Sequence, residues 1–293
     1  MAPASFDLMA SMVLRETSII YEPRKEYLIE ARLQPLALQA GCATVDQYVA
    51  TLSADPAERR KAIDALTINE TSWFRDNTPY QAFTDHILPD LLAHRPGRHL
   101  RIWSAACSSG QEAYSIAMLL DQHLPGGWTA EILATDISTA MIARVEAGRY
   151  SQVEMNRGLP ATHLVRYFSR AGSEWEIVPR LRSMVRARHL NLARPFGAVG
   201  SFDLILLRNV LIYFDPATKH DILRRMRQSL VGDGYLLLGS TETTFDLPAD
   251  LSAQWEHEQL GRVQAHRPAG AAGSRNVRAG SSAAALSSVL PGA

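Results

Sequence analysis

From residue 98 onward, short apolar runs alternate with segments of helical periodicity, and this alternation constrains the fold more than any other feature of the sequence. Four of the apolar runs are predicted strands, at residues 100–103, 132–136, 202–207 and 235–239. The intervening segments are predicted helices, one ending at Leu120, one near Met141 and one at about 216–230. Apolar strands that alternate with helices form a parallel sheet with helices on both faces. The sequence therefore predicts an α/β domain whose ligands bind past the carboxyl ends of the strands.

The segments around this alternating region have different patterns. Residues 6–75 carry apolar residues at helical spacing and no strand pattern, which predicts an all-helical N-terminal domain. Residues 151–190 interrupt the alternation, and the runs 175–178 and 184–188 within them are predicted to be short antiparallel strands of an inserted subdomain. After about residue 266 the composition turns to Ala, Gly, Ser and Arg, which is typical of a disordered tail. We therefore expect a helical domain over residues 1–80, an α/β domain over 81–265 with its β-subdomain at about 151–190, and a tail over 266–293.

Length and charge argue against several classes of function. A chain of 293 residues is long enough for about two domains, and its 30 basic and 30 acidic residues give a net charge of zero. Broad binding to nucleic acid needs an excess of positive charge, so we expect no nucleic-acid partner. The sequence has no apolar run near the roughly 20 residues that span a bilayer and no pattern typical of a signal peptide, so we expect a cytoplasmic protein without direct membrane insertion. Cys42 and Cys107 lack metal-ligand spacing, and we expect no metal.

A short polar turn joins the first predicted strand to its helix. Ser108, Ser109 and Gly110 form this turn. Glycine lets a ligand approach the backbone closely, and the start of the helix offers free N–H donors to a carboxylate or a phosphate. A plain turn is the commoner reading of one glycine at such a place, and both the dinucleotide pattern G-x-G-x-x-G and the lysine of a P-loop are absent. Cys107 is expected to be a small side chain that packs beside a ligand.

Polar residues follow several of the predicted strands. Asp136 ends the second strand, where a carboxylate can accept hydrogen bonds from both hydroxyls of a ribose. From spacing alone, capping of the next helix at Ser138 is an equal alternative. Asn191 follows a strand-like run, and Arg208 with Asn209 follows the third strand. We expect these side chains at the ligand-binding edge of the sheet.

A second polar group belongs to the helical region. Asn69, Thr71 and Arg75 flank two adjacent aromatic residues, which would hold the polar side chains at a domain junction. From the residues alone, helix caps and a surface charge explain this group better. Tyr213 has apolar neighbours on both sides, so a core aromatic is an open alternative to an active-site hydroxyl.

Three segments taken in order resemble the CheR family of chemotaxis-receptor methyltransferases. They are residues 67–76 (TINETSWFRD), 103–115 (WSAACSSGQEAYS) and 208–215 (RNVLIYFD). The resemblance covers about residues 6–265. It implies a Rossmann-like, S-adenosylmethionine-dependent methyltransferase domain with an inserted small antiparallel β-subdomain, preceded by an all-α N-terminal domain. It also implies that the protein uses S-adenosylmethionine, leaving S-adenosylhomocysteine, to esterify glutamates of chemoreceptors.

The resemblance assigns roles to individual residues. The cofactor-binding residues that it implies are Asn69, Thr71, Arg75, Gln111, Asp136, Asn191, Leu192, Arg208 and Asn209. Arg75 and Tyr213 are the implied catalytic residues, which orient the acceptor carboxylate, and Arg32 is the implied substrate-binding residue. Gln111 stands where the family usually has glutamate, and an amide cannot form an ion pair with the ammonium group of the cofactor. Glu112 is a second candidate for that contact.

The implied partner is an acidic helical segment in the cytoplasmic bundle of a methyl-accepting chemotaxis receptor. Some family members dock on a peptide at the receptor's C-terminus through a longer loop of the β-subdomain. The corresponding stretch here, residues 169–175, is short, so we expect this protein to act without such a tether peptide. A non-catalytic S-adenosylmethionine-binding regulatory module is the alternative function, and Gln111 is its support. A methyltransferase for nucleic acid or small molecules would keep the fold, but zero net charge and the helical N-terminal domain argue against it.

Overall fold

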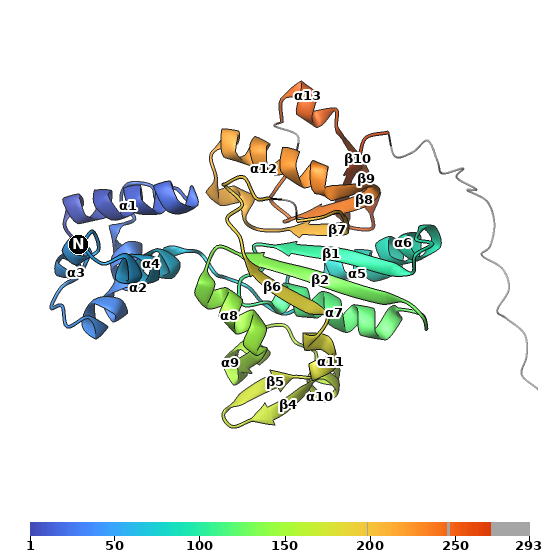
Figure 1. The fold of residues 1–293 in the computed structure, drawn as a ribbon, viewed down its shortest axis with the longest axis horizontal. Coiled ribbons are helices and arrows are strands. Elements are labelled where there is room, and N and C mark those ends of the chain that lie inside the picture. Colours follow the sequence, from blue (N-terminus) through green and yellow to red (C-terminus); the bar gives the residue numbers. More distant parts are fainter. Residues whose placement is uncertain (198, 245–246, 271–293) are drawn as a thin grey trace, which may run out of the picture.

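The computed structural model describes residues 1–197, 199–244 and 247–270. Four helices at the N-terminus pack together at one end of the molecule (Figure 1). They are α1 (Pro3–Thr17), α2 (Glu26–Gln39), α3 (Val45–Thr51) and α4 (Pro56–Leu66). The prediction of an all-helical N-terminal domain is therefore confirmed.

Local sequence sets where these helices begin. Thr44 precedes α3, and its side chain accepts a hydrogen bond from the backbone of Gln47. Asp55 caps α4 in the same way through two backbone N–H groups, and Pro56 occupies the first helical position, where its missing N–H costs nothing. Buried residues such as Leu33 and Tyr48 then join the helices into one core.

An extended segment leads from α4 to the α/β domain. Residues 67–77 carry the polar and aromatic motif, and three short helical segments follow it. These are α5 (Thr78–Ala82), the π-helical turn η1 (Phe83–Ile87) and α6 (Leu88–His94). The motif thus lies between the two domains.

The central sheet has seven strands in the order β6-β2-β1-β7-β8-β10-β9. The first five in this order run parallel to their neighbours, while β10 is antiparallel to both β8 and β9. The bounds are β1 (His99–Ala105), β2 (Thr129–Asp136), β6 (Val185–His189), β7 (Phe202–Leu207), β8 (Leu230–Leu238), β9 (Trp255–Leu260) and β10 (Val263–Pro268). The chain builds outward from β1 to β6 and then returns to the other side of β1 with β7. This reversal creates a crevice at the carboxyl ends of β1 and β7.

Alternate strand residues enter two cores on opposite faces of the sheet. Ile102 packs into a core with α6 and α7 (Gln111–His123), whereas the adjacent Trp103 packs on the other face. That second face is covered by α12 (Pro216–Ser229) and shares its core with the N-terminal helices. Figure 1 shows α7 and α12 on opposite sides of the sheet. The parallel sheet with helices on both faces is as predicted.

A three-stranded antiparallel sheet lies apart from the main one, below α8 (Thr139–Ala147) in Figure 1. Its strands, in the order β3-β5-β4, are β3 (Arg149–Ser151), β5 (Glu174–Ile177) and β4 (Phe168–Ala171). Three short helices accompany them, α9 (Gln152–Met155), α10 (Ala161–Tyr167) and α11 (Pro179–Arg182). The inserted β-subdomain is confirmed.

The prediction for residues 184–188 was wrong in one respect. This run forms β6, which pairs in parallel with β2 at the edge of the main sheet, with Val185 opposite Ile132. An edge strand exposes part of its surface, so β6 carries alternating charged residues and resembles a strand of a small antiparallel sheet.

The C-terminal hairpin of β9 and β10, with α13 (Ala249–Ser252) before it, was not predicted. Glu256 and Glu258 on β9 break up any apolar run, so the strand pattern is hidden. Residues 266–268 belong to β10 and not to a tail. Residues 269–270 form a turn, and residues 271–293 of the predicted tail lie outside the described residues. Among the helices that the structure describes, none has the length and apolar character needed to cross a bilayer.

Candidate active site

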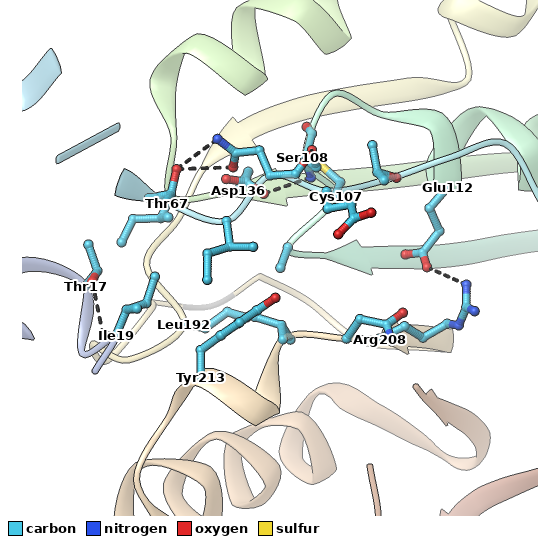
Figure 2. A pocket seen from close by; sticks show the side chains of 18 of the residues that line it. Thr17, Ile19, Thr67, Cys107, Ser108, Glu112, Asp136, Leu192, Arg208 and Tyr213 are labelled. Atoms are coloured by element: carbon cyan, nitrogen blue, oxygen red, sulfur yellow. Dashed lines mark hydrogen bonds and ion pairs between the residues drawn. The ribbon is translucent and has the colours of Figure 1, made fainter. Parts of the chain in front are cut away.

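A cavity that is open to solvent lies at the carboxyl ends of the parallel strands, where the sheet meets the helical domain (Figure 2). The segments that follow β1, β2, β6 and β7 all line it, and the interdomain segment closes it from the other side. Its lining includes Thr17, Ile19, Thr67, Asn69, Thr71, Arg75, Cys107, Ser108, Glu112, Asp136, Ile137, Asn191, Leu192, Arg208, Asn209 and Tyr213. The polar residues predicted at strand ends and those predicted at the domain junction thus meet around one space.

The turn after β1 is tightly built. Gly110 has a φ of 94°, and a side chain there would bring a Cβ within 3.0 Å of Val145 Cγ2. The helix α7 begins directly afterwards, and Gln111 at its start is buried, with its side-chain oxygen accepting a hydrogen bond from Ser109 at 2.8 Å. Gln111 does not line the cavity, whereas Glu112 does. Of the two candidates for contact with the ammonium group of the cofactor, Glu112 lines the cavity and Gln111 does not.

Asp136 is buried at the end of β2 and is held by the backbone. Its Oδ2 accepts from the N–H of Ser108 at 2.8 Å, and its Oδ1 accepts from the N–H of Ser138 at 2.9 Å. Ser138 itself caps α8. Burial raises the pKa of Asp136, and the backbone donors oppose this shift. Each carboxylate oxygen keeps lone-pair capacity beyond its one bond, so support of the turn and binding of a ligand are compatible.

Arg208 ties the two sides of the cavity together. Its guanidinium, only 1% exposed, donates to Glu112 Oε2 at 3.1 Å and to Asp76 Oδ2 at 2.8 Å, as well as to the backbone oxygen of Arg75 at 2.9 Å. Burial disfavours its charge, but Glu112, Tyr80 and Asp76 outweigh burial and raise the pKa of Arg208. Figure 2 shows the Arg208–Glu112 pair at one end of the cavity.

Arg75, in the interdomain segment, and Tyr213, in the loop after β7, both line the cavity. Arg75 Nη1 donates to the backbone oxygen of Glu70 at 2.9 Å. Tyr213 lies at the end of the 3-10 turn η2 (Leu211–Tyr213), and its ring projects towards the cavity in Figure 2. Burial raises the pKa of Tyr213, while the charge of Arg75 works against that rise. Its phenol therefore stays protonated at neutral pH and can donate a hydrogen bond.

Three hydrogen bonds around the cavity join its segments and involve Asn69, Asn191 and Tyr213. The backbone oxygen of Asn69 accepts from Ser108 Oγ at 2.8 Å. The amide of Asn191 donates to the backbone oxygen of Glu16 at 2.7 Å. The backbone N–H of Ile20 donates to Tyr213 at 3.4 Å. Buried Leu192 follows Asn191 and adds an apolar surface to the lining, which also includes Thr71.

Two family models match this chain along most of its length. The all-alpha domain of CheR methyltransferases matches residues 4–67, and their SAM binding domain matches residues 69–257. The chain belongs to the CheR methyltransferase family.

Curated relatives in the CheR family match over most of their own length. Chemotaxis protein methyltransferase 1 of Pseudomonas aeruginosa is 39% identical over 256 residues, which cover 84% of this chain and 93% of that protein. Chemotaxis protein methyltransferase Cher2 of Pseudomonas putida is 38% identical over 253 residues, covering 83% and 91%. A chemotaxis protein methyltransferase of Listeria monocytogenes is 33% identical over 239 residues, covering 82% and 89%.

Arg32 lies outside the cavity lining of this CheR-family protein. Its Nη1 donates to the backbone oxygens of Leu66 and Thr67, at 3.4 and 3.1 Å, and to the hydroxyl of Tyr21. Arg32 thus fastens the end of α4 beside the cavity, because Thr67 is part of the lining. A role in substrate binding stays a prediction for Arg32.

Sequence reasoning missed two parts of the site. Thr17 and Ile19 reach the cavity from the end of α1, and no sequence pattern marks them, because they approach through the packing of the domains. Glu242 supports the loop after β7 through hydrogen bonds to its backbone. Among the described residues, no group of three or more His, Cys, Asp and Glu side chains could hold a metal ion.

Proposed function

We propose that this CheR-family protein uses S-adenosylmethionine to methylate glutamate side chains on the cytoplasmic domain of chemoreceptors, giving methyl esters for sensory adaptation. The observation that carries the proposal is that Arg75 of the interdomain segment and Tyr213 of the loop after β7 line the same cavity as Asp136 and Glu112. The names of the relatives support a chemotaxis role, and a cytoplasmic location belongs to the same proposal.

The polar residues that line the cavity fit the proposed cofactor. Asp136 has free acceptor capacity for ribose hydroxyls, and Glu112 can accept from an ammonium group. Asn69, Thr71 and Arg75 would bind from the interdomain side, and Asn191, Leu192, Arg208 and Asn209 would bind from the strand ends. When bound, S-adenosylmethionine supplies a methyl group on a positively charged sulfur.

The acceptor needs orientation more than activation. A glutamate with an ordinary pKa of about 4.3 is already an anion at neutral pH, so the reaction requires no general base. The residues around the cavity must strip water from this carboxylate and hold it in line. Arg75 would hold one oxygen through a charge-assisted hydrogen bond. Tyr213, with its raised pKa, would donate a second, neutral hydrogen bond.

We propose catalysis in preference to the alternative of a non-catalytic regulatory module. Gln111 was the one residue that favoured it, and the Gln111 side chain is turned to Ser109 outside the cavity lining. We propose that Glu112, which lines the cavity, provides the acidic group for the ammonium of the cofactor.

A methyl-transfer assay tests the proposed function. The protein is incubated with labelled S-adenosylmethionine and the cytoplasmic fragment of a receptor from the same genome. We expect label on the receptor fragment that mild alkali releases, because carboxyl methyl esters hydrolyse readily. A receptor fragment that gains no label, or gains only alkali-stable label, would contradict the proposal.

A further inference from the structure

The side chain of Glu242 accepts four backbone hydrogen bonds, three of them from the loop that carries Tyr213. It lies in the loop that follows β8, while the turn it binds follows β7. Its Oε1 accepts from the N–H groups of Val210 and Leu211 at 2.8 and 2.6 Å. Its Oε2 accepts from Asn209 and Gly239 at 2.7 and 2.8 Å. One carboxylate thus binds three successive N–H groups of one strand end and one of the neighbouring strand end.

Three successive N–H groups that converge on one anion form a concave backbone site. Such a curve requires an unusual backbone, and Asn209 has a φ of 58°. Most residues avoid this region, and Asn tolerates it better than most. The carboxylate compensates for the strain, because hydrogen bonds to an ionised acceptor are stronger than neutral ones.

Gly239 leaves room for this contact. A Cβ at Gly239 would lie 2.6 Å from Glu242 Oε2 and 2.8 Å from the backbone nitrogen of Asn209. Both distances are far below normal contact, so any side chain at Gly239 would push the carboxylate and the turn apart. The contact between Glu242 and the turn therefore requires glycine at position 239.

The turn that Glu242 binds forms part of the cavity wall. Asn209 and Val210 line the cavity directly, and Tyr213 follows two residues after Leu211. The orientation of the Tyr213 ring depends on where the 3-10 turn begins, which the N–H groups bound to Glu242 determine.

We infer that Glu242 is a positioning residue, which holds the turn from Asn209 to Tyr213 in the geometry needed for methyl transfer. The part that concerns methyl transfer rests on the function proposed above, and the part that concerns the turn does not.

Glu242→Gln tests the inference with little change in shape. An amide has one acceptor oxygen and turns its NH₂ group towards N–H donors, so it cannot satisfy both halves of the site. We expect hydrogen exchange at the amides of Asn209, Val210 and Leu211 to become at least about tenfold faster. We expect kcat to fall by roughly 10- to 100-fold, with the KM for receptor changed by less than about threefold. Gly239→Ala, which displaces the carboxylate without altering it, should reproduce both effects.

A surface control and a double variant separate positioning from general damage. Glu146→Gln removes an exposed carboxylate from α8 and should leave amide exchange and kcat unchanged. In a Tyr213→Phe background, Glu242→Gln should lower kcat by less than about threefold. The reason is that Glu242 acts by placing the Tyr213 hydroxyl, which this background already lacks.

Three results would overturn the inference. They are unchanged exchange in Glu242→Gln, normal kcat despite faster exchange, and an equal loss of kcat in the wild-type and Tyr213→Phe backgrounds. If the wild-type protein transfers no methyl group at all, the proposed function fails, and amide exchange still decides whether Glu242 holds the turn.

Discussion

At the scale of single residues, most charged groups of the cavity are already paired before any ligand binds. Arg208 is committed to Glu112, Asp76 and the backbone, and Asp136 is held by two N–H groups. Arg75 differs, because the hydrogen bond to Glu70 uses only one of its donors. Arg75 is therefore better able than Arg208 to donate hydrogen bonds to a substrate carboxylate. The buried Arg208 instead connects Glu112 to Asp76.

Arg75→Lys should lower turnover by roughly 10- to 100-fold, since a lysine cannot reproduce the planar pair of donors that orients a carboxylate. Steady-state methyl-transfer kinetics measure this effect, and thermal unfolding should show little loss of stability, because Arg75 is only half-buried. The control is Arg166→Lys on α10, an exposed arginine outside the cavity lining. Wild-type turnover in Arg75→Lys would reduce Arg75 to a surface or packing residue.

Asp136→Asn should weaken S-adenosylhomocysteine binding by roughly tenfold, because an uncharged amide is a poorer acceptor for hydroxyl groups. It should also lower the free energy of unfolding by about 1–3 kcal/mol, because one backbone N–H then faces an NH₂ group. Calorimetric titration and chemical denaturation give the two values. If the folded variant binds S-adenosylhomocysteine as tightly as the wild type, Asp136 supports the turn and does not bind the cofactor.

The predicted site residues differ in how far the sequence could place them. Asp136, Asn191 and Arg208 follow strands, and the rule that ligands bind at the carboxyl ends of parallel strands was enough to bring them together. Gln111 and Glu112 are neighbours on a helix, and only the rotation of α7 decides which of them faces the cavity. Glu242 could not be found, since nothing in a local pattern shows that it reaches the backbone of another strand.

At the scale of elements, the hairpin of β4 and β5 bears on how a receptor is recruited. The strands are joined by a two-residue turn at Gly172 and Ser173, with Ala171 paired to Glu174. Gly172 has the positive φ of 67° that such a turn requires. The edge strand β4 is only four residues long, and short edges are poor templates for an added strand.

We therefore expect no saturable binding of a peptide that carries the last five residues of a receptor. Calorimetric titration at micromolar protein concentrations checks this, with S-adenosylhomocysteine as the positive control for folded protein. Saturable micromolar binding that maps to residues 165–185 would show that the short hairpin is no obstacle to a tether.

Elements with continuous apolar runs were predictable, and edge elements were not. The strand β7 is buried throughout and was predicted with its observed bounds, 202–207. In contrast, β6 and β9 lie at the two edges of the sheet, where one side of a strand can remain polar. A polar edge strand can be assigned only through its partner, and a pairing between distant segments does not show in a local pattern.

At the scale of the whole molecule, one buried histidine links stability to pH. His266 on β10 is 1% exposed, and its Nδ1 lies 3.0 Å from Nδ1 of His257. Burial, with the charge of His257 as a smaller cause, lowers the pKa of His266 from 6.5 to about 4. His266 is therefore protonated below about pH 6.5 in the unfolded chain but only below about pH 4 in the folded protein.

Stability should accordingly fall as the pH drops from 6.5 towards 4, by up to roughly 3 kcal/mol from this residue alone. Chemical denaturation of wild type and of His266→Gln across this range measures the effect, since the variant lacks the titrating group. If the difference in unfolding free energy between the two proteins does not change with pH, His266 does not have this role.

We propose that the seam between the two domains orients a glutamate carboxylate of the receptor for methylation. Peptide mass spectrometry of a receptor cytoplasmic fragment, after incubation with the protein and S-adenosylmethionine, tests it most directly. We expect methyl groups on glutamate side chains of the helical bundle, at levels sharply reduced with Arg75→Lys. Methyl groups on another residue type, or glutamate methylation that is equally fast with Arg75→Lys, would contradict it.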